Sequence, residues 1–200
     1  MVSPVKSPCY ADLIIFRPAR FSAAQGTEEC HKGASMHFEY VVTDKCGSGF
    51  FTITKDPCLL YSTEVGGFSV LLGGDWRYEL NVSSATGQCV GFLGTLVGNI
   101  QEKSLEIPPH CKGDVFFYHD EELLPGGGCH YLPIANHAYY DPEQKILCVG
   151  DPDSAGTAIE FTENIVMIIS DNVLPAVYLN LKNARWEIPC RRLTQMARLR

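Results

Sequence analysis

The chain of 200 residues is 46% hydrophobic and 20% charged, with 9 cysteines, 18 glycines and 12 prolines. This composition excludes a disordered chain and a collagen-like repeat, and no apolar run reaches the roughly 18 residues of a membrane span. The formal net charge of −7 is concentrated in an acidic body, which disfavours nucleic-acid binding by the main domain.

Short runs of Val, Ile, Phe and Tyr, bounded by Gly, Pro, Asp or Asn, predict β-strands along most of the chain. The predicted strands are 12–16, 36–43, 49–54, 58–62, 68–72, 76–82, 89–97, 115–119, 145–150, 157–161, 164–170 and 176–181. Residues 44–48 and 73–75 have the composition of hairpin turns. In the predicted strand 76–82, Trp76, Tyr78, Leu80 and Val82 alternate onto one face.

Helical spacing is limited to residues 181–199, where Pro189 interrupts it. The polar segment 101–112 contains two prolines and predicts a loop or a sub-boundary. We therefore predict a mainly β protein, a single-domain antiparallel β-sandwich or barrel over residues 1–184, with a short C-terminal helix or tail over 185–200.

The tail forms the one basic segment of the sequence. It either complements the acidic body or binds an anionic partner such as lipid or RNA. Its arginines beyond residue 190 are Arg191, Arg192, Arg198 and Arg200.

The nine cysteines are an odd count, and the first twenty residues lack a secretory apolar region. The expected compartment is therefore cytoplasmic and reducing, with mostly free, buried thiols. In a processed secreted fragment, up to four disulfides would form instead, and the sequon at Asn81 would matter.

A histidine-rich stretch between residues 110 and 137 contains candidate metal ligands. Three imidazoles and one carboxylate suit Fe, Zn or Mn. The candidate ligands are His119, Glu121, His130 and His137. Pro125, Gly127 and His130 have a spacing that resembles the second motif of the cupins, which implies a metal-dependent enzyme with a small barrel; no paired-histidine motif precedes it, so the chain is not assigned to that family.

The same stretch offers a candidate nucleophile in Cys129, which follows three glycines. Backbone N–H groups of such a loop lower a thiol pKa and bind an oxyanion, and neighbouring histidines supply a base. The chemistry implied is that of a cysteine hydrolase or transferase.

Paired aromatic residues place one ring on each face of a strand, one in the core and one exposed. Exposed rings beside carboxylates suit protein or cationic partners. The candidate binding residues are Phe117, Tyr139, Tyr140, Asp120 and Glu122. Because no strong catalytic signature occurs, the first hypothesis is a non-catalytic module that binds a macromolecular partner, such as a basic protein. The metal-dependent enzyme and the cysteine enzyme are the alternatives.

Overall fold

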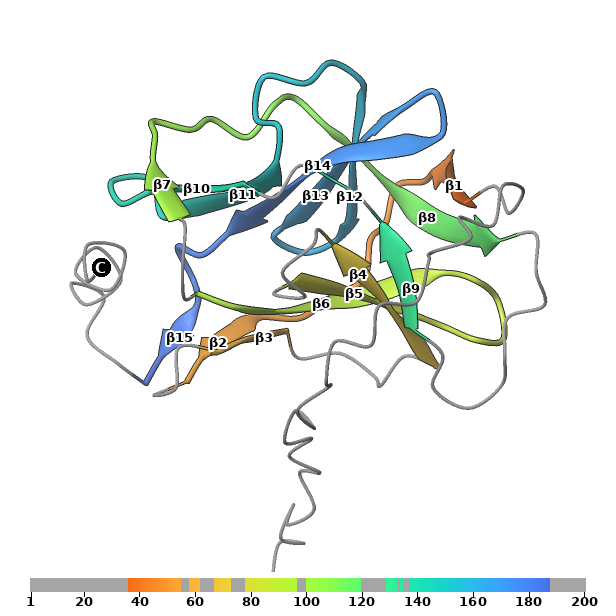
Figure 1. Ribbon diagram of the computed structural model, residues 1–200, viewed down its shortest axis with the longest axis horizontal. Helices are drawn as coiled ribbons and strands as arrows, with labels where there is room; N and C mark the ends of the chain where they lie inside the picture. The colour runs from red at the N-terminus through yellow and green to blue at the C-terminus, as the bar shows by residue number, and fades with distance from the viewer. Residues whose placement is uncertain are drawn as a thin grey trace, which may run out of the picture. The chain divides into compact units, whose positions relative to one another are not determined.

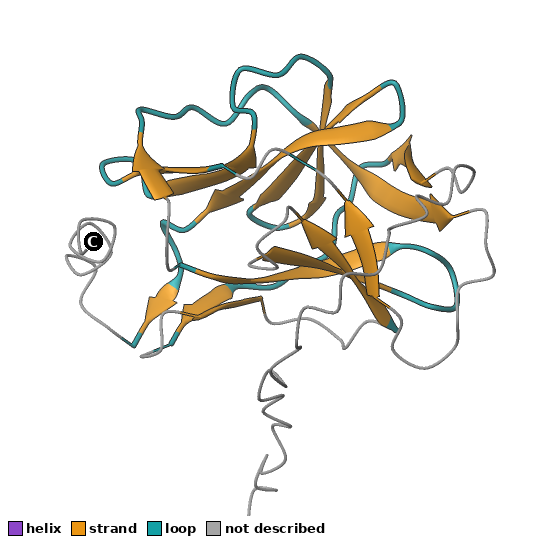
Figure 2. Cartoon of the chain, in the orientation of Figure 1, coloured by secondary structure: helices purple, strands orange, loops and turns teal. Residues whose placement is uncertain are grey.

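The computed structural model describes residues 36–54, 58–61, 67–72, 78–96, 100–119, 129–132, 134 and 137–187. All of them belong to one compact unit. They form fifteen strands in two sheets, and no helix occurs among them (Figures 1 and 2). The predicted all-β class is confirmed. No helix in the described residues has the length and apolar character needed to cross a membrane.

The first sheet has eight strands, which follow one another across the sheet in a non-sequential order. That order is β1 (Met36–Val42), β8 (Cys111–His119), β12 (Thr157–Thr162), β13 (Ile165–Ser170), β14 (Val173–Asn180), β11 (Ile146–Gly150), β10 (Ala138–Asp141) and β7 (Ile100–Glu102).

The second sheet has seven strands. Their order is β15 (Arg185–Trp186), β2 (Phe51–Ile53), β3 (Cys58–Tyr61), β6 (Cys89–Thr95), β5 (Tyr78–Val82), β4 (Phe68–Leu72) and β9 (Cys129–Leu132). Most neighbouring strands are antiparallel, as predicted, but β7–β10, β8–β12, β2–β15 and β4–β9 are parallel. The sheets are therefore mixed, and they form a sandwich rather than a closed barrel.

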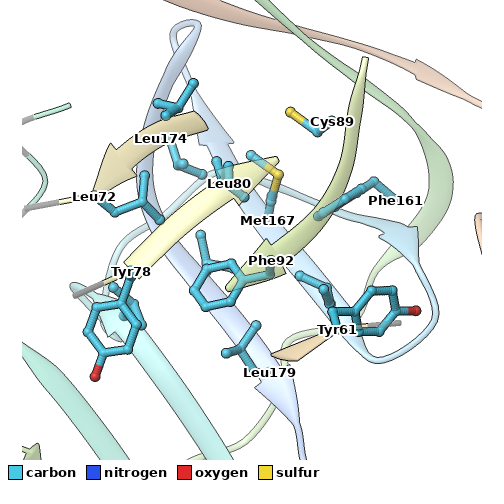
Figure 3. Close-up of a cluster of buried hydrophobic side chains, with 14 of the residues drawn as sticks. Tyr61, Leu72, Tyr78, Leu80, Cys89, Phe92, Phe161, Met167, Leu174 and Leu179 are labelled. Atoms are coloured by element: carbon cyan, nitrogen blue, oxygen red, sulfur yellow. The ribbon is translucent and has the colours of Figure 1, made fainter. Parts of the chain in front are cut away.

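The main core lies between the two sheets. Leu80 and Phe92 of the second sheet pack with Met167 and Leu179 of the first, and all four are fully buried (Figure 3). Truncating a buried ring such as Phe92 to alanine typically costs about 3–5 kcal/mol. The alternation predicted for residues 76–82 is confirmed where it is described, because Tyr78, Leu80 and Val82 are all buried.

A second apolar cluster covers the outer face of the eight-stranded sheet. Residues of the segment between β7 and β8, chiefly Leu105 and Ile107, pack there on Ile146, Cys148 and neighbouring side chains. Both faces of β11 are consequently buried, which explains its unbroken apolar sequence. Within the predicted loop 101–112, residues 103–110 thus form an irregular segment between β7 and β8, and this segment covers the sheet.

The hairpin predicted at residues 44–48 is wrong, because the strands on either side of it belong to different sheets. Instead of turning back, the chain crosses between the sheets, and Gly47 pairs with Thr162 at the end of β12. A Cβ atom at Gly47 would lie 2.8 Å from the Thr162 hydroxyl oxygen, so this contact needs glycine. The other predicted hairpin has its expected pairing, since β4 and β5 are antiparallel with Leu72 opposite Tyr78.

Four strands escaped prediction: β7, β9, β10 and β15. Of these, β7, β9 and β15 are short edge strands that pair in parallel with segments distant in sequence. The predicted helix is not present in its described part, because residues 181–187 form a turn and β15. The predicted strand 12–16 and the tail beyond residue 187 lie outside the described residues.

Candidate interaction site

The predicted metal ligands are distributed over both sheets. His119 ends β8 and is half-buried, whereas His137 is exposed before β10, with its ring 6.5 Å from that of Tyr139. The backbone of His130 lies on β9 of the other sheet, opposite Val70. Glu121 lies outside the described residues, within which no three His, Cys, Asp or Glu side chains gather as a metal-binding group. The metal site stays a prediction.

The proposed nucleophile Cys129 begins β9, where its backbone is in register with Ser69. Its side chain and the three glycines before it lie outside what the structure describes. The thiol chemistry predicted there therefore stays a prediction.

The predicted binding aromatics occupy packed positions. Phe117 is fully buried between the sheets and Tyr140 is buried, so each contributes to the core rather than to a surface. Tyr139 is half-buried, with the Lys103 ammonium 5.4 Å from its ring centroid. The expected alternation within each aromatic pair is present, but Asp120, Glu122 and the four arginines of the tail lie outside the described residues.

A thiol, a carboxylate and an imidazole meet at the junction of β12 with the 103–110 segment. The same Glu160 oxygen, Oε2, lies 3.9 Å from Cys46 Sγ and 3.9 Å from His110 Nε2. Burial, and then the Glu160 carboxylate, raise the pKa of the Cys46 thiol. A thiol held protonated is a poor nucleophile, so this cluster supports a structural contact rather than thiolate chemistry.

A small cavity of about 200 Å³ lies beside this cluster, between the start of β6 and the end of β12. It is lined by Gly47, Ser48, Gln88, Cys89, Val90, Phe161 and Thr162. Burial raises the pKa of the Cys89 thiol to about 12, so this thiol also stays protonated. Ligand pockets usually occupy about 300–1,000 Å³, which makes this cavity small for a substrate.

The edge strand β1 has a different character, because half of its backbone hydrogen-bonding capacity faces away from β8. Phe38 of β1 and Phe117 of β8 are opposite each other but form no hydrogen bond to each other through their N–H groups, which point away from the partner strand. Phe38 N donates to Asn172 O at 2.8 Å, and Phe117 N donates to Gly87 O. Because hydrogen-bonded and non-hydrogen-bonded pairs alternate along antiparallel strands, the backbone N–H and C=O groups of Tyr40 and Val42 also point away from β8. No hydrogen bond joins their backbone groups to any residue that the structure describes.

Apolar side chains gather along this edge. Tyr40, Val41 and Val42 are 38%, 55% and 56% exposed. Tyr118, which stacks on the ring of His37 at 5.2 Å, and Val173, which follows Asn172, are exposed as well. These five are the majority of the seven exposed large apolar side chains among the described residues.

The length of β1 separates it from the other three edge strands that the structure describes. β7, β9 and β15 contain three, four and two residues, whereas β1 contains seven. Proteins ordinarily keep exposed edges short, charged or covered, because open N–H and C=O groups recruit further strands. Glu39 is the one carboxylate on β1, which leaves its second half apolar and open.

No protein-family model matches the chain, and no curated protein matches its sequence.

Sequence reasoning missed this edge, although a signal was present. In the run MHFEYVV, the alternation of apolar and polar residues ends at Glu39, and three consecutive apolar residues follow. A strand with one buried face explains two of these three apolar residues, because alternate side chains share a face, and the third is then an apolar residue on the other face. The cluster of Cys46, His110 and Glu160 left no such signal, because its members are more than 40 residues apart.

Proposed function

We propose that the chain is a non-catalytic binding module that accepts an extended segment of a protein partner as an additional strand on β1. This proposal rests on the second half of β1, where the outward N–H and C=O groups of Tyr40 and Val42, between exposed apolar side chains, have no hydrogen-bond partner among the described residues. Strand addition derives affinity from such main-chain groups and specificity from the alternating side chains beside them.

The charges near this edge are mixed. Three acidic residues, Glu39, Asp44 and Asp171, and two basic ones, Lys45 and Lys112, lie on β1 or beside it in sequence or in the hydrogen-bonded register. The edge therefore offers backbone pairing and apolar contact rather than a uniformly acidic field that selects basic partners.

A peptide probe tests this function on the full chain. We expect a blocked octapeptide of alternating valine and threonine, flanked by lysines, to slow hydrogen exchange of the Tyr40 and Val42 amides, measured by NMR. The Val41 amide is the internal reference, because it already faces β8. The matched control peptide carries proline at alternate positions and cannot form a ladder.

Two variants test whether the open backbone is responsible. Val42→Pro removes one outward N–H and should abolish peptide binding, whereas Val42→Thr retains it and should bind as the wild type does. The proposal is overturned if the octapeptide protects no β1 amide, or if it binds the proline variant equally well while circular dichroism shows that variant to be folded.

A further inference from the structure

The open stretch of β1 is limited at both ends. At one end the turn that precedes β14 occupies the edge, since Asn172 O accepts the outward N–H of Phe38. At the other end Thr43 N still donates to Lys112 O, but the chain bends at Asp44. Residues 39–43 therefore form the segment that a further strand can cover, with Val41 at its centre.

We propose that the strand accepted here is β1 of a second copy of this chain, paired antiparallel about a two-fold axis at Val41. This inference rests on the proposed function, because it names the occupant of the same edge. A dimer formed in this way joins two eight-stranded sheets into one continuous sheet and covers both open edges with a single isologous contact.

The backbone hydrogen bonds select this register. With the axis at Val41, Tyr40 faces Val42 of the second copy, and each such pair exchanges two hydrogen bonds, which gives four in total. Moving the axis to Tyr40 pairs Val42 with Phe38, whose N–H is already bonded to Asn172. Moving it to Val42 pairs Tyr40 with Asp44, where the chain bends. In each alternative, only the central pair can exchange both of its hydrogen bonds.

The side chains agree with the same register. Tyr40 and Val42 lie on the face that includes the buried Phe38, and their cross-strand contact is an aromatic–β-branched pair, which is favourable. On the opposite face Val41 meets its own symmetry mate. The one carboxylate of β1, Glu39, faces neutral Thr43, so no like charges stand opposite each other.

Cysteine cross-linking tests the register directly. At the axis, the Cα atoms of Val41 and its mate are expected about 4.5 Å apart, within the range that a disulfide spans. Under mild oxidation, Val41→Cys should therefore form a disulfide-linked dimer, identified by mass spectrometry of the linked peptide. Glu39→Cys is the matched control: it lies on the same face, but its Cα atoms are about 13 Å apart in this register, so it should stay unlinked.

Solution mass gives an independent measurement. Sedimentation of the full chain should show a dimer whose population rises with protein concentration and with salt, because salt screens the repulsion between two acidic bodies. Val41→Lys places two ammonium groups face to face at the axis and should give a monomer. Leu60→Lys, the same kind of change on an exposed residue of the other sheet, should still give the dimer. Circular dichroism verifies that each variant is folded.

The outcomes separate this inference from the proposed function. If the chain stays monomeric while the octapeptide still protects the Tyr40 and Val42 amides, the proposal that a second copy binds β1 is overturned, and strand addition by a segment of another protein stands. A dimer that survives Val41→Lys, or that links through Glu39→Cys, overturns the register and places the contact elsewhere. If neither a dimer nor peptide binding is observed, both this inference and the proposed function are overturned.

Discussion

The carboxylate of Asp141 fastens the segment between β7 and β8 to the sheet: its Oδ2 accepts a hydrogen bond from Leu105 N at 2.8 Å. Its Oδ1 accepts from Glu143 N at 2.9 Å and from Gln144 N at 2.8 Å. Asp141 is only 3% exposed, so these three N–H groups replace its hydration. The contact also places Leu105 over the second apolar cluster.

Replacing Asp141 by asparagine should lower the free energy of unfolding by about 1–3 kcal/mol, because an amide offers one acceptor oxygen and no charge to three donors. Urea denaturation measures the change. Asp153→Asn is the control, since that carboxylate is exposed and, among the described residues, bonds the Lys103 side chain alone; it should change stability little. Equal effects of the two substitutions would show that Asp141 does not fasten the segment.

The same carboxylate predicts a dependence on acid. Hydrogen bonds from the backbone of Gln144, Leu105 and Glu143 hold the pKa of the Asp141 carboxyl below its ordinary value. Because the folded pKa lies below the unfolded one, the stabilisation is complete above the unfolded value of about 3.9 and is lost as the pH falls through the folded pKa. The stability difference between the wild type and Asp141→Asn should therefore shrink in strong acid. A difference that stays constant from neutral pH to about pH 2 would contradict this.

A hydroxyl pair links the two sheets. Tyr61 of β3 donates to Glu163 O at 2.8 Å and lies 2.8 Å from the hydroxyl of Thr162 on β12. Burial raises the pKa of Tyr61 to about 12, so the phenol stays a donor at ordinary pH. Tyr61→Phe should lower the free energy of unfolding by about 1–3 kcal/mol, because it leaves the buried Thr162 hydroxyl and the Glu163 carbonyl without this partner.

A double-mutant cycle with Thr162→Val checks that origin. The double variant should lose less stability than the sum of the losses of the two single variants, because removing both hydroxyls leaves fewer unsatisfied groups. Thermal or urea unfolding of the four proteins gives the coupling. Strict additivity would show that the two hydroxyls do not act together.

Alkylation rates test the environment of Cys46. Its raised thiol pKa predicts slow reaction with iodoacetamide at neutral pH, slower than that of the exposed Cys111. Glu160→Gln removes the nearest carboxylate, so it should lower the Cys46 pKa and accelerate alkylation at that residue, measured by peptide mass spectrometry. An unchanged Cys46 rate in a folded Glu160→Gln protein would exclude the carboxylate as a cause.

The elements predicted correctly are those that local pattern encodes. Tyr78, Leu80 and Val82 alternate because one face of β5 is buried, and β4 and β5 pair antiparallel, as the turn composition of residues 73–75 predicted. The apolar run of β11 shows a strand buried on both faces. Each signal depends only on residues a few positions apart.

The candidate site was predicted far less well, since the residues singled out between 110 and 137 are divided between two sheets, are buried in the core or lie outside the described residues. The open edge of β1 depends on which strand pairs with it and on where the chain between β1 and β2 goes. Gly47 docks on β12 and Asn172 bonds Phe38, and both contacts join residues more than a hundred positions apart.

By itself, then, the sequence determined that the chain forms strands, where most of them run and which faces they bury, because side-chain periodicity and turn composition are local properties. The tertiary structure alone decided which strands became neighbours, and so why the outward backbone groups of Tyr40 and Val42 have no partner within the described part of the chain. Strand order follows from the joint burial of two whole sheet faces, and no short window of sequence contains that information.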